Sequence, residues 1–174
     1  DTIEHLVQSG DRIHRIDAVL SGTLNYLFST FGSECGFVES VKGAMDAGFT
    51  EPDPRIDLSG VDVQRKILIL AREAGYTMEM ADVENPGFLP PALMEGSVAD
   101  FLDKLPTAEE DMQTRLAQAA SEGLQLRYVA SFELNASGEP KARVGLQALP
   151  TTHAFCQLQG SDNAVMLHLS LIHI

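Results

Sequence analysis

The spacing of hydrophobic and polar positions along the chain predicts helices and strands in mixed order. Several apolar stretches have helical spacing and stop at a glycine, whereas others have the length and composition of strands. The predicted helices span residues 2–8, 22–30, 37–47, 59–74, 98–102 and 107–122, and the predicted strands span 12–20, 124–135, 141–149 and 163–169. We therefore expect an α+β fold, in which a mixed, largely antiparallel sheet has helices packed on one face.

Local signals predict where some of these elements begin and end. The last two long strands are expected to form a hairpin that turns at residues 136–139. Ser97, Ser59 and Thr107 are each predicted to cap a helix, and Thr107 is followed three residues later by the glutamate of a capping box. Residues 77–91 contain three prolines and are expected to be mostly irregular.

The predicted helix 59–74 carries a lysine beside a long apolar run. Residues 67–71 are all apolar, which predicts a helix buried on most sides and places Lys66 at the rim of the core. Asp62 precedes Lys66 by four residues, so the two side chains share one helical face. A lysine near a core needs a partner or a chemical role. The pair is therefore a candidate for proton transfer, and its alternative is an ordinary surface ion pair.

The loop before this helix is acidic and stiffened by two prolines, which restrict both themselves and the residues before them. Its carboxylates, with that of the helix, are Glu51, Asp53, Asp57 and Asp62. Such a loop is suited to holding charged groups in place for a ligand, although Asp53 is expected to brace Arg55. Two other classes of function remain open: a carboxylate site for calcium or magnesium, and a regulatory or dimerisation module.

Four segments resemble sequences typical of the homoserine dehydrogenase family. They are Ser21-Gly-Thr-Leu-Asn-Tyr-Leu-Phe28, the stretch from Gly48 to Lys66 that includes Pro-Arg-Ile-Asp-Leu-Ser-Gly, Leu68-Ile-Leu-Ala-Arg-Glu-Ala-Gly75 and Gly160-Ser-Asp-Asn163. The resemblance covers residues 1–168 and is strongest to bifunctional enzymes in which an aspartokinase precedes the dehydrogenase. It implies interconversion of L-aspartate 4-semialdehyde and L-homoserine with NADP or NAD, in the biosynthesis of threonine and methionine.

The resemblance also implies roles for individual residues. Lys66 corresponds to the proton donor of the family, accompanied by Asp62. Glu51 corresponds to the residue that binds the substrate ammonium, and Asp57 to a second acid of the same loop. Gly22 and Thr23 correspond to residues beside the substrate, where the first turn of a helix suits the substrate carboxylate. Phe49 departs from the family, because many members have a tyrosine there.

Composition and charge limit the possible partners. The 174 residues are 44% hydrophobic and 21% charged, which is ordinary for a globular domain. The net charge of −13 argues against nucleic acid and anionic membranes as partners, and no apolar run is long enough to span a bilayer. Cys35 and Cys156 have no metal-binding spacing and are expected to be free thiols in the cytoplasm. The five histidines form no ligand pattern, so we assign none of them a role and name no metal-binding residue in the main interpretation.

A nucleotide-binding signature is missing from the chain. None of the 14 glycines forms the Gly-x-Gly-x-x-Gly turn that binds the pyrophosphate of a dinucleotide. We therefore expect residues 1–168 to be the substrate-binding domain of a longer enzyme, with the dinucleotide bound mainly by segments outside the chain. Residues 169–174 depart from the family and are expected to be a foreign tail. The fragment is expected to be inactive alone, and the enzyme to be a homodimer or a higher homo-oligomer.

Overall fold

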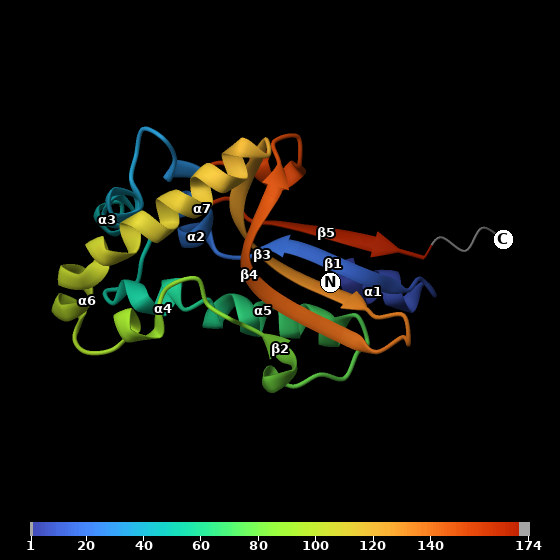
Figure 1. Ribbon diagram of the computed structural model, residues 1–174. Helices are drawn as coiled ribbons and strands as arrows, with labels where there is room; N and C mark the ends of the chain where they lie inside the picture. The colour runs from blue at the N-terminus through green and yellow to red at the C-terminus, as the bar shows by residue number, and fades with distance from the viewer. Residues whose placement is uncertain (1, 171–174) are drawn as a thin grey trace.

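A five-stranded sheet forms the centre of the protein in the computed structural model, which describes residues 2–170 (Figure 1). Its strands, in spatial order, are β2 (Val83–Glu84), β4 (Pro140–Pro150), β3 (Leu124–Leu134), β1 (Ile13–Val19) and β5 (Ala164–Leu169). Neighbouring strands are antiparallel except for the two-residue β2, which is parallel to β4. The predicted mixed, largely antiparallel sheet is thus confirmed.

The longest pairing in the sheet is the predicted hairpin of β3 and β4. It is continuous from the pair Leu124 and Pro150 to the pair Leu134 and Pro140. The side chain of Asn135 accepts hydrogen bonds from the N–H groups of Ser137 and Glu139, which fixes the connecting turn. Strand β1 lies between β3 and β5, so the first strand of the chain is paired on both sides by strands from its second half.

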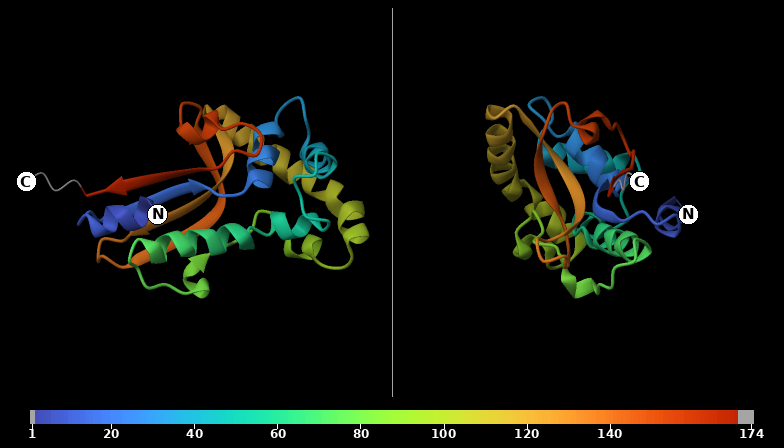
Figure 2. Two further views of the ribbon diagram at one scale, coloured as in Figure 1. Left: turned by 180° about the vertical axis from the view of Figure 1, so that it is seen from behind. Right: turned by 90° about the vertical axis from the view of Figure 1, so that its right-hand side faces the viewer.

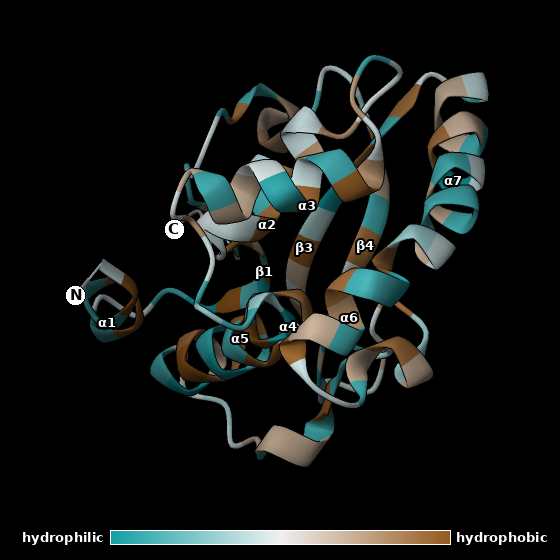
Figure 3. Cartoon of the chain, turned by 90° about the vertical axis from the view of Figure 1, so that its left-hand side faces the viewer, coloured by the Kyte–Doolittle hydropathy of each residue, from teal (hydrophilic) through white to brown (hydrophobic). Residues whose placement is uncertain are grey.

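Three helices cover one face of the sheet. They are α2 (Gly22–Thr30), α5 (Val61–Glu73) and α7 (Glu109–Ser121). The alternate residues Leu126, Tyr128, Ala130 and Phe132 of β3 point toward these helices and belong to the main hydrophobic core. Figure 3 shows hydrophobic and hydrophilic residues alternating around α5 and α7, as expected for helices with one buried side.

The opposite face of the sheet is covered only in part. Val19 and Val129 form a small second core with Phe155, which belongs to the short 3-10 helix η4 (Ala154–Gln157). Farther along the same face the exposed side chains are polar, beginning with Ser131 and Glu133 of β3. The expectation of helices on one face therefore holds for all the longer helices that contact the sheet.

The remaining helices surround this framework. They are α1 (Thr2–Gln8), α3 (Phe37–Asp46), α4 (Pro54–Leu58), α6 (Val98–Lys104) and the 3-10 turns η1 (Met80–Asp82), η2 (Pro91–Met94) and η3 (Leu105–Ala108). Helix α1 and the end of β5 lie at one end of the molecule, and α3 and α6 lie at the other (Figure 2). Within residues 2–170, every helix is too short or too polar to cross a bilayer.

The predicted helix 59–74 is present as α5, but the prediction that Ser59 is its N-cap is wrong, although the Ser59 hydroxyl accepts a hydrogen bond from Val61 N. Ser59 ends α4, and Gly60 begins α5 in the left-handed region with φ 68°. The hydroxyl of the buried Tyr128 lies where a side chain at position 60 would project. Only glycine fits there, because both the backbone angle and the space exclude a Cβ atom. This break at Gly60 separates α4, which carries Asp57, from α5, which carries Asp62. The sequence analysis had placed Asp57 in a loop.

Helix α5 is also less buried than its apolar run suggested. Ile67 and Leu68 are buried, but the side chain of Ile69 is 56% exposed. Lys66 lies on the exposed side as well, with 44% of its side chain accessible. The prediction of a helix buried on most sides is therefore wrong: one side of α5 faces the sheet, and Lys66 lies toward the exposed side, where its ammonium still contacts Leu20 O.

Two further local predictions differ from the structure. Thr107 donates its hydroxyl hydrogen bond backwards to Lys104 O, because η3 runs directly into α7 and leaves no free helix start to cap. Residues 77–91 are mostly irregular as expected, but they contain the short strand β2 on the sheet edge. The Ser97 cap is confirmed, since its hydroxyl accepts a hydrogen bond from Asp100 N and the Asp100 carboxylate accepts one in return.

Candidate functional site

The carboxylate of Asp57 connects the two segments that the sequence singled out. One of its oxygens lies 3.1 Å from the hydroxyl oxygen of Thr23, in the first turn of α2. Its other oxygen accepts a hydrogen bond of 2.8 Å from the backbone N–H of Glu51. The hydroxyl of Thr23 also contacts the carbonyl oxygen of Phe49. Asp57 and Thr23 therefore hold the acidic loop against α2, although 34 residues separate them in the sequence.

Asp53 braces Arg55, as the sequence analysis predicted. Asp53 accepts the N–H of Arg55 and so caps α4. Its carboxylate also forms an ion pair with the Arg55 guanidinium at 2.7 Å, and that hydrogen-bonded guanidinium lowers the pKa of Asp53. Arg55 continues to the carbonyl oxygens of Met94 and Gly96. These contacts fix the loop and leave Asp53 committed to its arginine.

Lys66 joins α5 to the end of β1. Its ammonium donates a hydrogen bond of 3.0 Å to Leu20 O and lies 2.7 Å from a carboxylate oxygen of Asp62. Leu20 directly follows β1 and precedes the helix that carries Thr23. The predicted pairing of Lys66 with Asp62 is therefore present, and it lies beside the junction between β1 and α2.

The first turn of α2 offers unpaired donors. Ser21 caps the helix by accepting a hydrogen bond from Leu24 N at 3.1 Å. The N–H groups of Gly22 and Thr23 precede the first hydrogen bonds within a helix and donate to no residue in the described part of the chain. An anion beside them would be stabilised by these N–H groups and by the helix dipole.

A segment that sequence reasoning left without a role lies directly against this turn. An ideal Cβ atom at Gly22 would lie 2.9 Å from both the Cβ atom and the carbonyl oxygen of Ser161. The side chain of Asn25 donates a hydrogen bond of 3.0 Å to Gly160 O. Gly22 is therefore required by close packing as well as by any ligand. The sequence signal was the Gly160–Asn163 motif itself, but its place in the fold depends on contacts across 135 residues.

The predicted site residues thus converge on the β1–α2 junction. The Asp57 carboxylate contacts both the Thr23 hydroxyl and the backbone N–H of Glu51, while Lys66 contacts Leu20 O, three residues before Thr23. The carboxylate of Glu51 is exposed and has no hydrogen bond or ion pair to residues 2–170, so it is free for a ligand. In that same range, no three His, Cys, Asp or Glu side chains are arranged to hold a metal ion.

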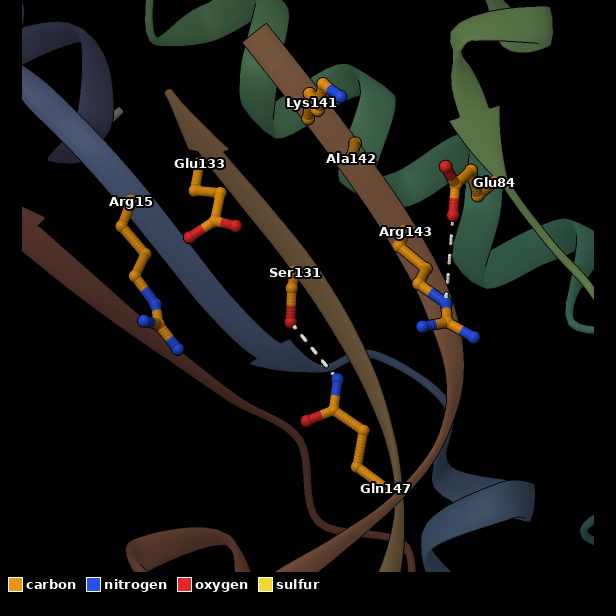
Figure 4. A pocket seen from close by; sticks show the side chains of 8 residues that line it. All are labelled: Arg15, Glu84, Ser131, Glu133, Lys141, Ala142, Arg143 and Gln147. Atoms are coloured by element: carbon orange, nitrogen blue, oxygen red, sulfur yellow. Dashed lines mark hydrogen bonds and ion pairs between the residues drawn. The ribbon is translucent and has the colours of Figure 1, made fainter. Parts of the chain in front are cut away.

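A separate pocket of about 360 Å³ lies on the partly open face of the sheet (Figure 4). It contains both cationic and anionic side chains. Its lining residues are Arg15, Glu84, Ser131, Glu133, Lys141, Ala142, Arg143 and Gln147. Arg143 and Glu84 approach each other across the β4 edge at 3.9 Å. Because this pocket includes none of the predicted catalytic or substrate-binding residues, it is distinct from the site at α2.

The geometry defines a domain that presents carboxylates, a lysine and helix N–H groups around one junction, as suits a small molecule with charges of both signs. The sequence model of homoserine dehydrogenase matches residues 1–173. The bifunctional aspartokinase/homoserine dehydrogenase 2 of maize, a chloroplast protein, is 42% identical over 166 residues, and the enzyme of that name from Escherichia coli is 44% identical over 162. The chain therefore belongs to the homoserine dehydrogenase family.

The match covers nearly all of this chain but only part of each relative. It includes 94% of the chain and 18% of the maize protein, and 93% of the chain and 20% of the E. coli protein. A crystal structure of a Candida auris protein of unknown function superimposes with a TM-score of 0.88 and 38% identity, over 97% of this chain and 48% of that one. The chain thus spans about a fifth of these relatives and about half of the solved protein.

Proposed function

We propose that the chain is the substrate-binding part of an NAD(P)-dependent homoserine dehydrogenase, which interconverts L-aspartate 4-semialdehyde and L-homoserine in threonine and methionine biosynthesis. The observation that carries this proposal is the Asp57 carboxylate, which joins Thr23 of one family motif to Glu51 of the other. Residues 1–168 would form this domain and residues 169–174 a foreign tail. Leu169 and Ser170 continue β5 beside β1, whereas residues 171–174 lie outside the described residues.

The strands and helices of residues 2–170 do not form the kind of turn that binds the phosphates of a dinucleotide. Dinucleotide-binding folds hold the pyrophosphate at a glycine-rich turn between a parallel strand and a helix. The only parallel pairing among residues 2–170 is that of β2, which is two residues long and is followed by irregular chain. We infer that segments outside this chain bind NADP or NAD, whose role is to accept or supply the hydride.

Lys66 would exchange the proton of the substrate hydroxyl. Alcohol oxidation requires a base at this oxygen, and the reverse reaction requires an acid. The Lys66 ammonium is held by Leu20 O and Asp62, and enough of its side chain is exposed to meet a ligand. Asp62 would orient the ammonium and keep a compensating charge beside it.

The charged amino-acid end of homoserine would bind on the other side of the junction. The free carboxylate of Glu51 suits the substrate ammonium. Asp57 and the Thr23 hydroxyl are already bonded to each other, so their proposed contribution is to fix the loop that carries Glu51. The backbone N–H groups of Gly22 and Thr23 would receive the substrate carboxylate.

Steady-state kinetics test these roles in a protein that also includes the nucleotide-binding segments. Lys66→Ala should reduce kcat by roughly 10²–10⁴, the usual contribution of a positioned acid or base, with a smaller change in the KM of homoserine. Glu51→Gln should chiefly raise that KM, because a neutral amide cannot balance the ammonium charge. The exposed Lys42 of α3 and Glu73 of α5 provide matched controls, Lys42→Ala and Glu73→Gln, which should change neither constant.

Each result has a contrary outcome. Near-normal kcat with only a raised KM in Lys66→Ala would make the lysine a binding residue. No turnover of homoserine by the unsubstituted protein would refute the proposed function as a whole. Calorimetric titration with calcium and magnesium addresses the carboxylate-metal alternative, since saturable binding by the unsubstituted chain but not by Glu51→Gln would favour it.

We also propose a homodimer or higher homo-oligomer in the cytoplasm, with no nucleic-acid or membrane partner. The free cysteines Cys35 and Cys156 are compatible with a reducing compartment. The polar pocket of Figure 4 lies on the sheet face left open by the helices, where a second subunit could pack. Light scattering at several protein concentrations measures the assembly directly, and a monomer throughout would contradict this part of the proposal.

A further inference from the structure

The guanidinium of Arg127 is a buried cation without a carboxylate partner. Arg127 lies on β3, and only 6% of its surface is exposed. No Asp or Glu within residues 2–170 forms an ion pair with it. Burial lowers the pKa of Arg127 below the ordinary arginine value. Burying an unpaired charge lowers the stability of a fold unless nearby acceptors form hydrogen bonds with its N–H groups.

Those neighbours are carbonyl oxygens from separate parts of the chain. Arg127 donates to Phe28 O at 2.9 Å and to its own neighbour Leu126 O at 2.7 Å. It also donates to Phe155 O at 3.3 Å and to Cys156 O at 3.4 Å, both in η4. Phe28 is in the last turn of α2, where carbonyl oxygens lack helical partners and the dipole favours a cation. Arg127 therefore ties the C-terminal end of α2 to η4.

The chain that leaves η4 returns to the opposite end of the same helix. Four residues after Cys156, Gly160 accepts the side-chain hydrogen bond of Asn25, and Ser161 then packs against Gly22. Asn25 is 1% exposed, and its side-chain oxygen has no hydrogen-bond partner in the described structure. The segment 155–161 is thus connected to both ends of helix α2, directly at Gly22 and Asn25 and through Arg127 at the end away from the proposed substrate site.

We propose that Arg127 is a positioning residue for the substrate site: by clamping α2 to η4, it keeps the Gly160–Asn163 turn seated on the first turn of α2. The inference rests on the proposed function, in which the N–H groups of that turn bind the substrate carboxylate. Without the clamp, η4 loses two hydrogen bonds and its connection to α2, and it is held to the sheet mainly by the packing of Phe155 on Val19 and Val129. The N–H groups of Gly22 and Thr23 then lose their fixed direction, and substrate binding suffers before chemistry does.

The test uses Arg127→Met and Arg127→Lys in the protein that includes the nucleotide-binding segments. Methionine fills similar space without donors. Lysine keeps the charge, but its single nitrogen cannot serve Phe28 O and η4 together. The expected result is a KM for homoserine raised about tenfold in Arg127→Met and at least threefold in Arg127→Lys, with kcat changed less than about twofold. Phe101→Leu, in the buried part of α6 that packs mainly on η2 and η3, is the control for general destabilisation.

Hydrogen exchange provides a readout that does not depend on turnover. Peptides covering residues 22–25 and 158–163 should exchange faster in both Arg127 variants and at the normal rate in the control. If the unsubstituted protein oxidises homoserine but neither Arg127 variant raises KM, or if Phe101→Leu raises it equally, the inference is wrong and the proposed function stands. If Arg127→Met does not fold, Arg127→Lys decides. If the unsubstituted protein is inactive, the proposed function fails, and unchanged exchange would separately exclude the clamp.

Discussion

The bond between Asp57 and Thr23 gives the most direct test of how the site is built. Asp57→Asn keeps the shape of the side chain, but its amide nitrogen cannot accept a hydrogen bond. The substitution should lose one charge-assisted hydrogen bond, about 1.5–3 kcal/mol, and a charge near the first turn of α2, about 0.3–1 kcal/mol. Thr23→Val removes the single hydroxyl proton that lies between the carboxylate and Phe49 O and should cost about 1–3 kcal/mol, because Thr23 is buried.

The double variant, Asp57→Asn with Thr23→Val, measures the coupling free energy between the two residues separately from their other interactions. If they act through one hydrogen bond, their combined loss should be smaller than the sum of the single losses by about 1–2 kcal/mol. Urea denaturation of this chain, followed by circular dichroism, measures all four free energies of unfolding. Asp62→Asn is the matched control, since Asp62 is 58% exposed and should contribute less than about 1 kcal/mol. Additive losses, within about 0.5 kcal/mol, would refute the proposed connection between the loop and α2.

Three more predictions concern other parts of the structure. Glu109→Gln should lower the free energy of unfolding by about 1–2 kcal/mol, because the Glu109 carboxylate accepts two N–H groups at the start of α3. Glu110→Gln is the control and should have little effect, because Glu110 is exposed. These hydrogen bonds help to lower the pKa of Glu109 in the folded protein. The loss of stability in Glu109→Gln, measured by denaturation at several pH values, should therefore be complete above about pH 5 and shrink as the pH falls below the ordinary glutamate pKa of about 4.3. In thermal denaturation, Gly60→Ala should destabilise the protein by about 2–5 kcal/mol, and Tyr128→Phe should restore part of this loss by removing the hydroxyl that the new Cβ atom meets. Gly75→Ala is the control: its φ is 91° and the space around it is open, so it should lose only the free energy of the unfavourable backbone angle. Fluorescence titration of this chain with NADPH should show no saturable binding, and tight binding would place the phosphate site within it.

Local sequence signals predicted the elements that are decided by nearby residues. The range of α2, the β3–β4 hairpin and the Ser97 cap were all predicted because a few adjacent residues determine them. The pairing of Lys66 with Asp62 was predicted for the same reason, as one helical turn separates them. The family resemblance was likewise readable from contiguous segments, and the match over residues 1–173 confirms it.

The features that sequence reasoning missed depend on partners far along the chain. The sequence analysis assigned a capping box to Thr107 and Glu110 and gave Glu109 no role, but the Glu109 carboxylate accepts the N–H groups at the start of α3, about 70 residues away. The break at Gly60 depends on the side chain of Tyr128, from a different strand. The exposure of Lys66 followed from the orientation of α5 on the sheet, which a run of apolar residues does not determine. Such contacts exist only after the sheet has assembled.

The place of β1 in the sheet has a consequence for synthesis of the protein. β1 ends at Val19, but its two partners begin at Leu124 and Ala164. At about 5–20 residues per second, a ribosome needs roughly 5–20 s to reach the first of these partners after β1 has been made. Throughout that interval β1 remains an unpaired strand whose backbone groups and apolar side chains other chains can bind. The start of α2, which follows β1 directly, can take its final position only after most of the chain has left the ribosome.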